Sequence, residues 1–183
     1  MILATWPLLI ALGTPQTIEP QAAPENEQAT EEKESPAARE GFLIGFTLGS
    51  GRFDCDACES DRGTALEFHL GGALSERAAL MFSVATIGRT DRGNHLQSSK
   101  ATLTGQYWVH PRLWFSGGVG FGGYSLVDNT RRYGSESSVA WAGGTGVEVV
   151  QSGRFALDLR VRYNYLTKFS TDDLTVQVGF TWY

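Results

Sequence analysis

The cysteine pair in the segment FDCDACESD is the first feature of the sequence that could do chemistry. Cys55 and Cys58 have a spacing that occurs in redox motifs, in half of a zinc site and in local disulfides. A redox motif would need a βαβ context, and zinc would need two further ligands, neither of which the sequence supplies. In an oxidising compartment we expect a disulfide. It would close a short ring, so its effect on stability should be local.

An acidic cluster surrounds these cysteines. It consists of Asp54, Asp56, Glu59 and Asp61. Carboxylates in a loop could bind Ca²⁺, but this segment lacks the ligand spacing and the glycine of an EF-hand loop. We therefore expect a solvated acidic loop and no metal site.

Glu67 and His69 lie two residues apart, which puts both side chains on one face of a strand. With a serine, they could serve a lipid hydrolase or acyltransferase. Such an enzyme needs its nucleophile where lipid can reach it, with the base and its orienting partner in hydrogen-bond range. The sequence offers no such set, so we expect neither an enzyme nor a cofactor site.

The segment 154–166, RFALDLRVRYNYL, indicates what kind of element positions these groups. Apolar and polar side chains alternate along it with the period of two that is typical of a strand. The apolar face holds Phe155, Leu157, Leu159, Val161, Tyr163 and Tyr165, and the other face holds Ala156, Asp158, Arg160, Arg162 and Asn164. The run exceeds an ordinary strand of about 5–6 residues and matches the about 9–11 residues that cross a bilayer when tilted.

Seven further segments repeat this alternation, which predicts eight strands. They cover 41–50, 65–72, 80–85, 99–109, 113–126, 138–150, 154–166 and 173–183. The connections alternate between long polar loops (52–63, 88–96, 127–136, 167–172) and short turns (73–77, 110–112, 151–153). Connections of this size join antiparallel neighbours, so we predict an all-β, eight-stranded, up-and-down barrel without open edges.

The direction of the apolar face decides the function class. Facing inward, it would line the cavity of a soluble, lipocalin-like carrier of an apolar ligand. We favour the outward direction, because a Lys or Arg facing lipid at mid-depth costs about 2–4 kcal/mol, whereas an interior network can pair its charges. The predicted lumen network comprises Glu67, His69, Lys100, Gln106, Glu148, Asp158, Arg160 and Arg162. We expect Glu67 to pair with Lys100, and Glu148 and Asp158 to pair with Arg160 and Arg162, which together plug the barrel.

Outward aromatic residues collect near the strand ends. Phe42, Tyr107, Phe115, Phe155 and Trp182 lie by the short turns, and Trp141, Tyr163 and Tyr165 lie by the long loops. Two such girdles are typical of a barrel that meets both membrane–water interfaces.

Two segments precede the predicted barrel. Residues 1–13 are apolar and predict a signal peptide, the alternative being an apolar tail on a cytosolic protein. Residues 14–40 hold seven Glu, four Pro and two basic residues, which indicates a disordered linker. Residues 41–183 hold 13 acidic and 13 basic residues, so the net charge of −5 comes from the linker. A neutral barrel excludes nucleic acid as the expected partner.

Strand number, alternation, loop asymmetry and the final segment LTVQVGFTWY resemble the OmpA/OmpX-type outer-membrane barrels over residues 41–183. This resemblance implies a barrel in the bacterial outer membrane, with the linker and short turns in the periplasm and the long loops outside the cell. It also implies contact with outer-membrane lipid and lipopolysaccharide, and recognition of the aromatic C-terminal strand by the insertion machinery. We expect a monomer with a structural role or a loop-mediated interaction role.

Overall fold

The computed structural model describes residues 39–55, 58–91, 94–128, 131–134 and 137–183. The predicted signal peptide and nearly all of the predicted linker lie outside these residues. The strands are β1 (Phe42–Cys55), β2 (Cys58–Ser75), β3 (Ala78–Asp91), β4 (Asn94–Trp108), β5 (Leu113–Asp128), β6 (Arg131–Gly134), β7 (Ser138–Ser152), β8 (Phe155–Leu166) and β9 (Thr171–Trp182). A short 3₁₀ helix, η1 (Thr167–Phe169), joins β8 to β9. Within the described ranges, no helix is long and apolar enough to span a membrane.

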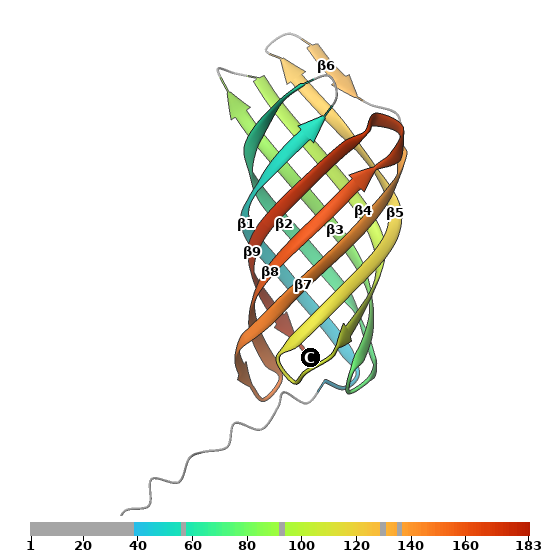
Figure 1. The fold of residues 1–183 in the computed structure, drawn as a ribbon, viewed down its shortest axis with the longest axis vertical. Coiled ribbons are helices and arrows are strands. Elements are labelled where there is room, and N and C mark those ends of the chain that lie inside the picture. The colour runs from blue at the N-terminus through green and yellow to red at the C-terminus, as the bar shows by residue number, and fades with distance from the viewer. Residues whose placement is uncertain (1–38, 56–57, 92–93, 129–130, 135–136) are drawn as a thin grey trace, which may run out of the picture. The chain divides into compact units, whose positions relative to one another are not determined.

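Eight of these strands form one closed antiparallel barrel (Figure 1). Neighbours in sequence pair with each other, β5 pairs with β7, and β1 pairs with β9 from Ile44 to Asp54. The β1–β9 ladder closes the sheet, which removes its open edges. β6 lies outside this closed set and pairs with the end of β5, Ser125–Asp128. The predicted eight-stranded, up-and-down barrel is confirmed.

Two of the predicted long loops are wrong in detail. Most residues of 52–63 and 88–96 continue the barrel strands as paired hairpins, with Arg52 opposite Arg62 and Arg89 opposite Leu96. Ladder pairing satisfies backbone N–H and C=O groups as water would, so strands extend past the apolar band without losing hydrogen bonds. The hairpins therefore rise from the end of the barrel opposite the C-terminus (Figure 1).

The other two predicted long loops also differ from the structure. β5 continues past Gly122, which is its last residue to pair with β7, and the short strand β6 lies within the region 127–136. The region 167–172 is compact, because η1 is followed by Ser170 in the left-handed conformation (φ 42°) and β9 then begins at Thr171. The wall of the barrel is thus lower at β7–β9 than at β3–β5.

The apolar face of each strand points outward. On β8, Leu159 is 51% exposed and Val161 41%, whereas Asp158 is 2% exposed and Arg160 6%. The same alternation holds on β9, where every second residue from Leu174 to Trp182 is outward. In the described strands these apolar side chains face outward and do not line a cavity, so the hypothesis of a lipocalin-like carrier is not supported.

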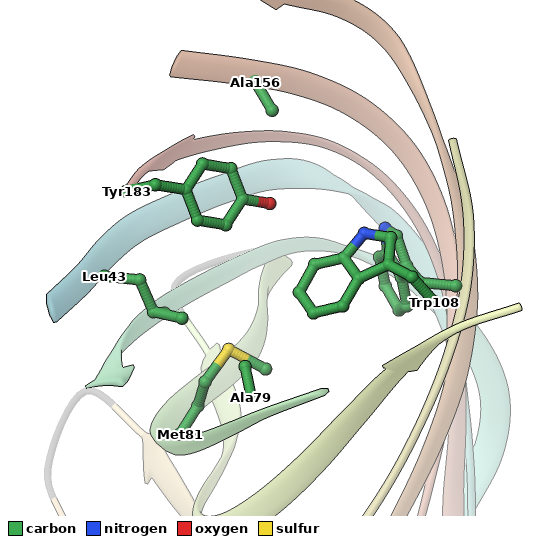
Figure 2. Close-up of a cluster of buried hydrophobic side chains, with 7 residues drawn as sticks. Leu43, Ala79, Met81, Trp108, Ala156 and Tyr183 are labelled. Carbon is green, nitrogen blue, oxygen red and sulfur yellow. The ribbon is translucent and has the colours of Figure 1, made fainter. Parts of the chain in front are cut away.

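Large side chains fill the end of the lumen next to the short connections (Figure 2). We call this end the floor. Its buried cluster consists of Leu43, Ala79, Met81, Trp108, Trp114, Ala156 and Tyr183. Glycines on the inward face make room for these groups. A Cβ added to Gly146 would lie 2.7 Å from Trp114 Cε2, which is closer than packed carbons approach.

Candidate functional site

Among the described residues, the lumen contains four ion pairs, each of one cation with one carboxylate. They are Arg39–Glu148, Lys100–Asp173, Arg160–Asp158 and Arg162–Glu67. Each of these side chains is 7% exposed or less. Buried charges are tolerable only when paired and hydrogen-bonded, so the strict one-to-one matching explains why the interior can hold so many of them.

Of the expected pairs, only Asp158 with Arg160 is present. Glu148 pairs with Arg39 in place of Arg160 or Arg162, and the expected pairing of Glu67 with Lys100 is also wrong. Glu67 accepts a hydrogen bond from Arg162, and Lys100 donates to Asp173. Arg162 also donates to Asn164 Oδ1, at 3.2 Å. Asp173 and Asn164 were not expected in the network, although the alternation of their strands places both on the inward face.

Asp158 and Arg160 pair along a single strand in two-point geometry. Arg160 Nε and NH2 each lie 2.6 Å from one oxygen of the Asp158 carboxylate. The guanidinium also stacks over Trp114, with Cζ 5.0 Å from the ring centroid. Gly179 lies opposite Asp158 on β9, and a Cβ there would lie 2.7 Å from Asp158 Oδ1. Gly179 thus leaves the space that the side chains of Asp158 and Arg160 occupy.

His69 and Gln106 are buried on the inward faces of β2 and β4. His69 Nε2 lies 3.2 Å from Thr181 Oγ1, and the ring covers Gly45. Ser83 lies directly opposite His69 on β3, yet its Oγ has no hydrogen-bond partner among the described residues. The histidine therefore faces the closed interior and not the lipid-facing wall, where a lipid-modifying enzyme would need it.

The floor contains a second polar cluster, centred on Glu148. Its carboxylate accepts hydrogen bonds from Trp108 Nε1 at 2.7 Å, Tyr183 Oη at 2.9 Å and Arg39 NH2 at 2.8 Å. Burial and the adjacent Glu148 carboxylate raise the pKa of the Tyr183 phenol, so it stays protonated and donates. The sequence assigned Arg39 to the linker and left Tyr183 unassigned. The alternation that puts Trp182 outward would have placed Tyr183 inside.

The predicted girdle residues lie on the outside of the barrel. Those next to the short connections are Phe42, Tyr107, Phe115, Phe155 and Trp182, and those next to η1 are Trp141, Tyr163 and Tyr165. Several touch each other: Phe155 and Trp182 meet edge to face at 6.2 Å between ring centroids. Their interfacial role stays a prediction.

Polar side chains replace apolar ones on the outside of β1 and β2 as these strands approach the long hairpins. Along β2 the outward residues change from Leu66 through Thr64 to Arg62, and on β1 Arg52 lies opposite Arg62. A groove of about 620 Å³ lies against this surface. We call it the upper groove, and its lining includes Arg62, Thr64, Leu66, Thr86, Gly88 and Gln97.

The cysteines lie at the tip of the β1–β2 hairpin, where the backbone register makes Cys55 and Cys58 partners. Their side chains, like those of Asp56, Glu59 and Asp61, lie outside the described residues, so the disulfide stays a prediction. Asp54 forms an exposed ion pair with Arg52, with 3.2 Å between the charged atoms. In the part of the chain that the structure describes, no group of three or more His, Cys, Asp or Glu side chains could bind a metal.

An apolar exterior around an ion-paired interior defines a transmembrane β-barrel of the outer-membrane type. The chain belongs to the family of outer membrane protein beta-barrel domains, whose model matches residues 23–182. No curated relative matches it in sequence.

Solved structures share this fold at low sequence identity. The first is neisserial surface protein A (NspA), at 13% identity and a TM-score of 0.69, covering 78% of this chain and 96% of that one. Ail, the attachment invasion locus protein of Yersinia pestis, matches at 15% identity and a TM-score of 0.56, covering 78% and 99%. Ail has also been crystallised with the heparin analogue sucrose octasulfate. The N-terminal barrel of Pseudomonas aeruginosa OprF matches at 13% identity and a TM-score of 0.50, covering 76% and 97%. The protein is thus an OmpA/OmpX-type barrel of the bacterial outer membrane.

Proposed function

We propose that this protein is a monomeric, non-enzymatic barrel whose long hairpins face the cell exterior and whose upper groove binds lipopolysaccharide. The linker and the short connections would lie in the periplasm. The change from apolar to cationic side chains on the outside of β1 and β2 carries this proposal, because it occurs where the membrane surface should lie.

The asymmetry of the connections supports this orientation. Outer-membrane barrels have short periplasmic turns and longer extracellular loops. Here the short connections, the C-terminus and Arg39 share the floor end, and the extended hairpins occupy the other end (Figure 1). The upper groove then lies at the level of the outer leaflet, beside the hairpins.

The chemistry of the upper groove suits a phosphorylated sugar headgroup. Arg62 supplies a planar guanidinium that can bind phosphate through two parallel hydrogen bonds, and Thr64 and Gln97 offer donors for sugar hydroxyls. Leu66 continues the lining toward the apolar band, where acyl chains would lie. Arg52 lies directly opposite Arg62, so the two guanidinium groups concentrate positive charge beside the groove.

A non-enzymatic role is supported by the position of His69. The histidine, Glu67 and Ser83 are all buried in the lumen. The lumen is closed at the floor by Trp108, Tyr183 and the Glu148 cluster, so a lipid substrate has no access from that end.

The groove is tested by the amount of lipopolysaccharide that co-purifies with the barrel after mild detergent extraction. We expect Arg52→Gln with Arg62→Gln to lower the bound amount about tenfold or more, because each loses a charge-assisted hydrogen bond to phosphate. Arg77→Gln is the matched control, since Arg77 is exposed at the β2–β3 connection on the floor end. Binding to vesicles of lipopolysaccharide and of phosphatidylglycerol should be measured in parallel.

Equal retention by the double variant and by Arg77→Gln would contradict the proposal. Equal binding to both kinds of vesicle would show a general attraction to anionic lipid and would remove lipopolysaccharide as the specific partner.

A further inference from the structure

The floor of the barrel encloses the guanidinium group of Arg39. Arg39 lies three residues before β1 and is 6% exposed. Its NH2 donates to Glu148 Oε2 at 2.8 Å and to the carbonyl of Pro111 in the β4–β5 connection. An arginine that precedes the first strand would ordinarily be solvated, so this burial needs a reason.

The site has the two parts that recognise an organic cation. Trp108 and Tyr183 form an aromatic wall, with their rings 6.3 Å apart and inclined at 63°. The Arg39 Cζ lies 4.5 Å from the Trp108 centroid and 6.0 Å from that of Tyr183. Glu148 supplies the countercharge. Aromatic faces and a carboxylate together bind planar cations by stacking and by hydrogen bonding.

A β-bulge in β7 builds the polar part of the site. The register of β7 against β8 shifts between Glu148 and Val150, so Val149 and Val150 both point outward. Glu148 and Gln151, three residues apart, therefore both point inward, which regular alternation forbids. Gln151 Nε2 then donates to Glu148 and to Pro111 O. Bulges re-aim side chains in this way at sites of function.

The site is complete only in the closed barrel. Tyr183 is the last residue of the chain, and its backbone N–H donates to Arg154 O at 2.7 Å. Its ring reaches the lumen because β9 pairs with both β1 and β8. Figure 2 shows the phenol pointing inward from the chain end, toward Trp108. Before β9 has paired on both sides, half of the aromatic wall is absent.

We propose that the floor is a guanidinium receptor that binds Arg39 after barrel closure. The bound side chain closes this end of the lumen and fixes the C-terminal end of the linker to the floor. Glu148 supplies the charge, Trp108 and Tyr183 the stacking surface, and Gln151 and Pro111 the remaining hydrogen bonds. Arg39 would then be the point at which the chain is fixed to the floor before β1 begins.

Chemical rescue tests the receptor. In the full chain, Arg39→Ala leaves Glu148 buried without its cation, so we expect the unfolding equilibrium constant to rise about a hundredfold. Millimolar methylguanidinium should recover most of this loss and shift the Trp108 indole N–H resonance, assigned with Trp108→Phe. Methylammonium should recover little of the lost stability, because it is not planar and cannot donate two parallel hydrogen bonds to a carboxylate. Arg77→Ala, at an exposed arginine of the same end, should change neither quantity.

Folding kinetics in lipid vesicles test the order of events. A contact made after closure is absent from the transition state, so Arg39→Ala should leave the folding rate unchanged and raise the unfolding rate by the full stability loss. If the folding rate fell by as large a factor as the equilibrium constant changed, Arg39 would bind before closure. That result would contradict the proposed order of events. If methylguanidinium neither restored stability nor moved the Trp108 resonance, the receptor itself would be refuted. If Arg39→Ala does not fold, it should be refolded with methylguanidinium present. Recovery of the folded barrel would support the receptor, and no recovery would contradict it.

Discussion

Arg162 on β8 donates to Glu67 on β2 inside the lumen, although 95 positions separate the two residues in the chain. The second carboxylate oxygen of Glu67 has no hydrogen-bond partner among the described residues. The pair therefore links opposite parts of the wall through a single ionic contact, and its energy should be measurable by a double-mutant cycle.

Removing one partner of this pair should cost more than removing both. Arg162→Met or Glu67→Leu alone leaves a buried charge without its partner and should destabilise the barrel by about 3–5 kcal/mol. The double variant should lose markedly less than the sum, as judged by urea unfolding in lipid vesicles. Strict additivity of the two costs would show that the groups do not interact.

Two glycines on opposite faces should respond differently to alanine. Gly179→Ala places a methyl group 2.5 Å from Arg160 NH2 and should cost about 1–3 kcal/mol. Gly117 is exposed on the outside of β5 with nothing within 4 Å of an added Cβ, so Gly117→Ala should be neutral or stabilise by about 0.5–1 kcal/mol. Thermal unfolding in detergent compares the two. A stability loss in Gly117→Ala equal to that in Gly179→Ala would contradict the role of Gly179 as space for the ion pair.

A charge on the outside of β8 should be far more harmful than a larger apolar group. Val161→Arg should destabilise the membrane-inserted barrel by about 2–4 kcal/mol, whereas Val161→Leu should be nearly neutral. The fraction of protein with heat-modifiable gel mobility after folding into vesicles reports the difference. Equal folding of both variants would remove the lipid contact assigned to this face.

The cysteines at the tip of the β1–β2 hairpin should be oxidised in protein isolated from the outer membrane. Directly paired strand residues have Cα atoms about 4.5–5.5 Å apart, within the range a disulfide spans. Alkylation before and after reduction, read by mass spectrometry, should add two labels only after reduction. Reduction should leave barrel stability nearly unchanged because the closed ring is short. Labelling without reductant would refute the disulfide.

Much of the barrel could be predicted because a period of two assigns each residue to a face. Asp158, Arg160 and Arg162 lie inside and Leu159 and Val161 outside, as the alternation of β8 indicates. The same pattern says nothing about depth, which depends on how far each strand is staggered around the barrel. For that reason the inward positions of Glu67, Lys100 and Arg162 could be predicted, but their partners could not.

The extended hairpins were missed for a related reason. Near Arg52 and Arg62 the outward side chains are polar, so the alternation of apolar and polar residues that marks the barrel strands is lost. Arg39 was missed because its neighbours have the composition of a disordered linker, and local composition cannot report a contact with Glu148, 109 positions away. The β7 bulge breaks the alternation at Val149 and Val150, and only the ladder with β8 shows its position.

The unequal height of the barrel wall makes the two sides of its upper rim different. On the side of β3 to β6, the extended hairpins form a wall of hydrogen-bonded strands. On the side of η1, where the rim drops to Ser138, Leu166 and Thr171, nothing comparable stands above the lipid among the residues described. Among the described residues the rim is therefore lowest beside η1, and paired backbone extends further beside β3 to β6.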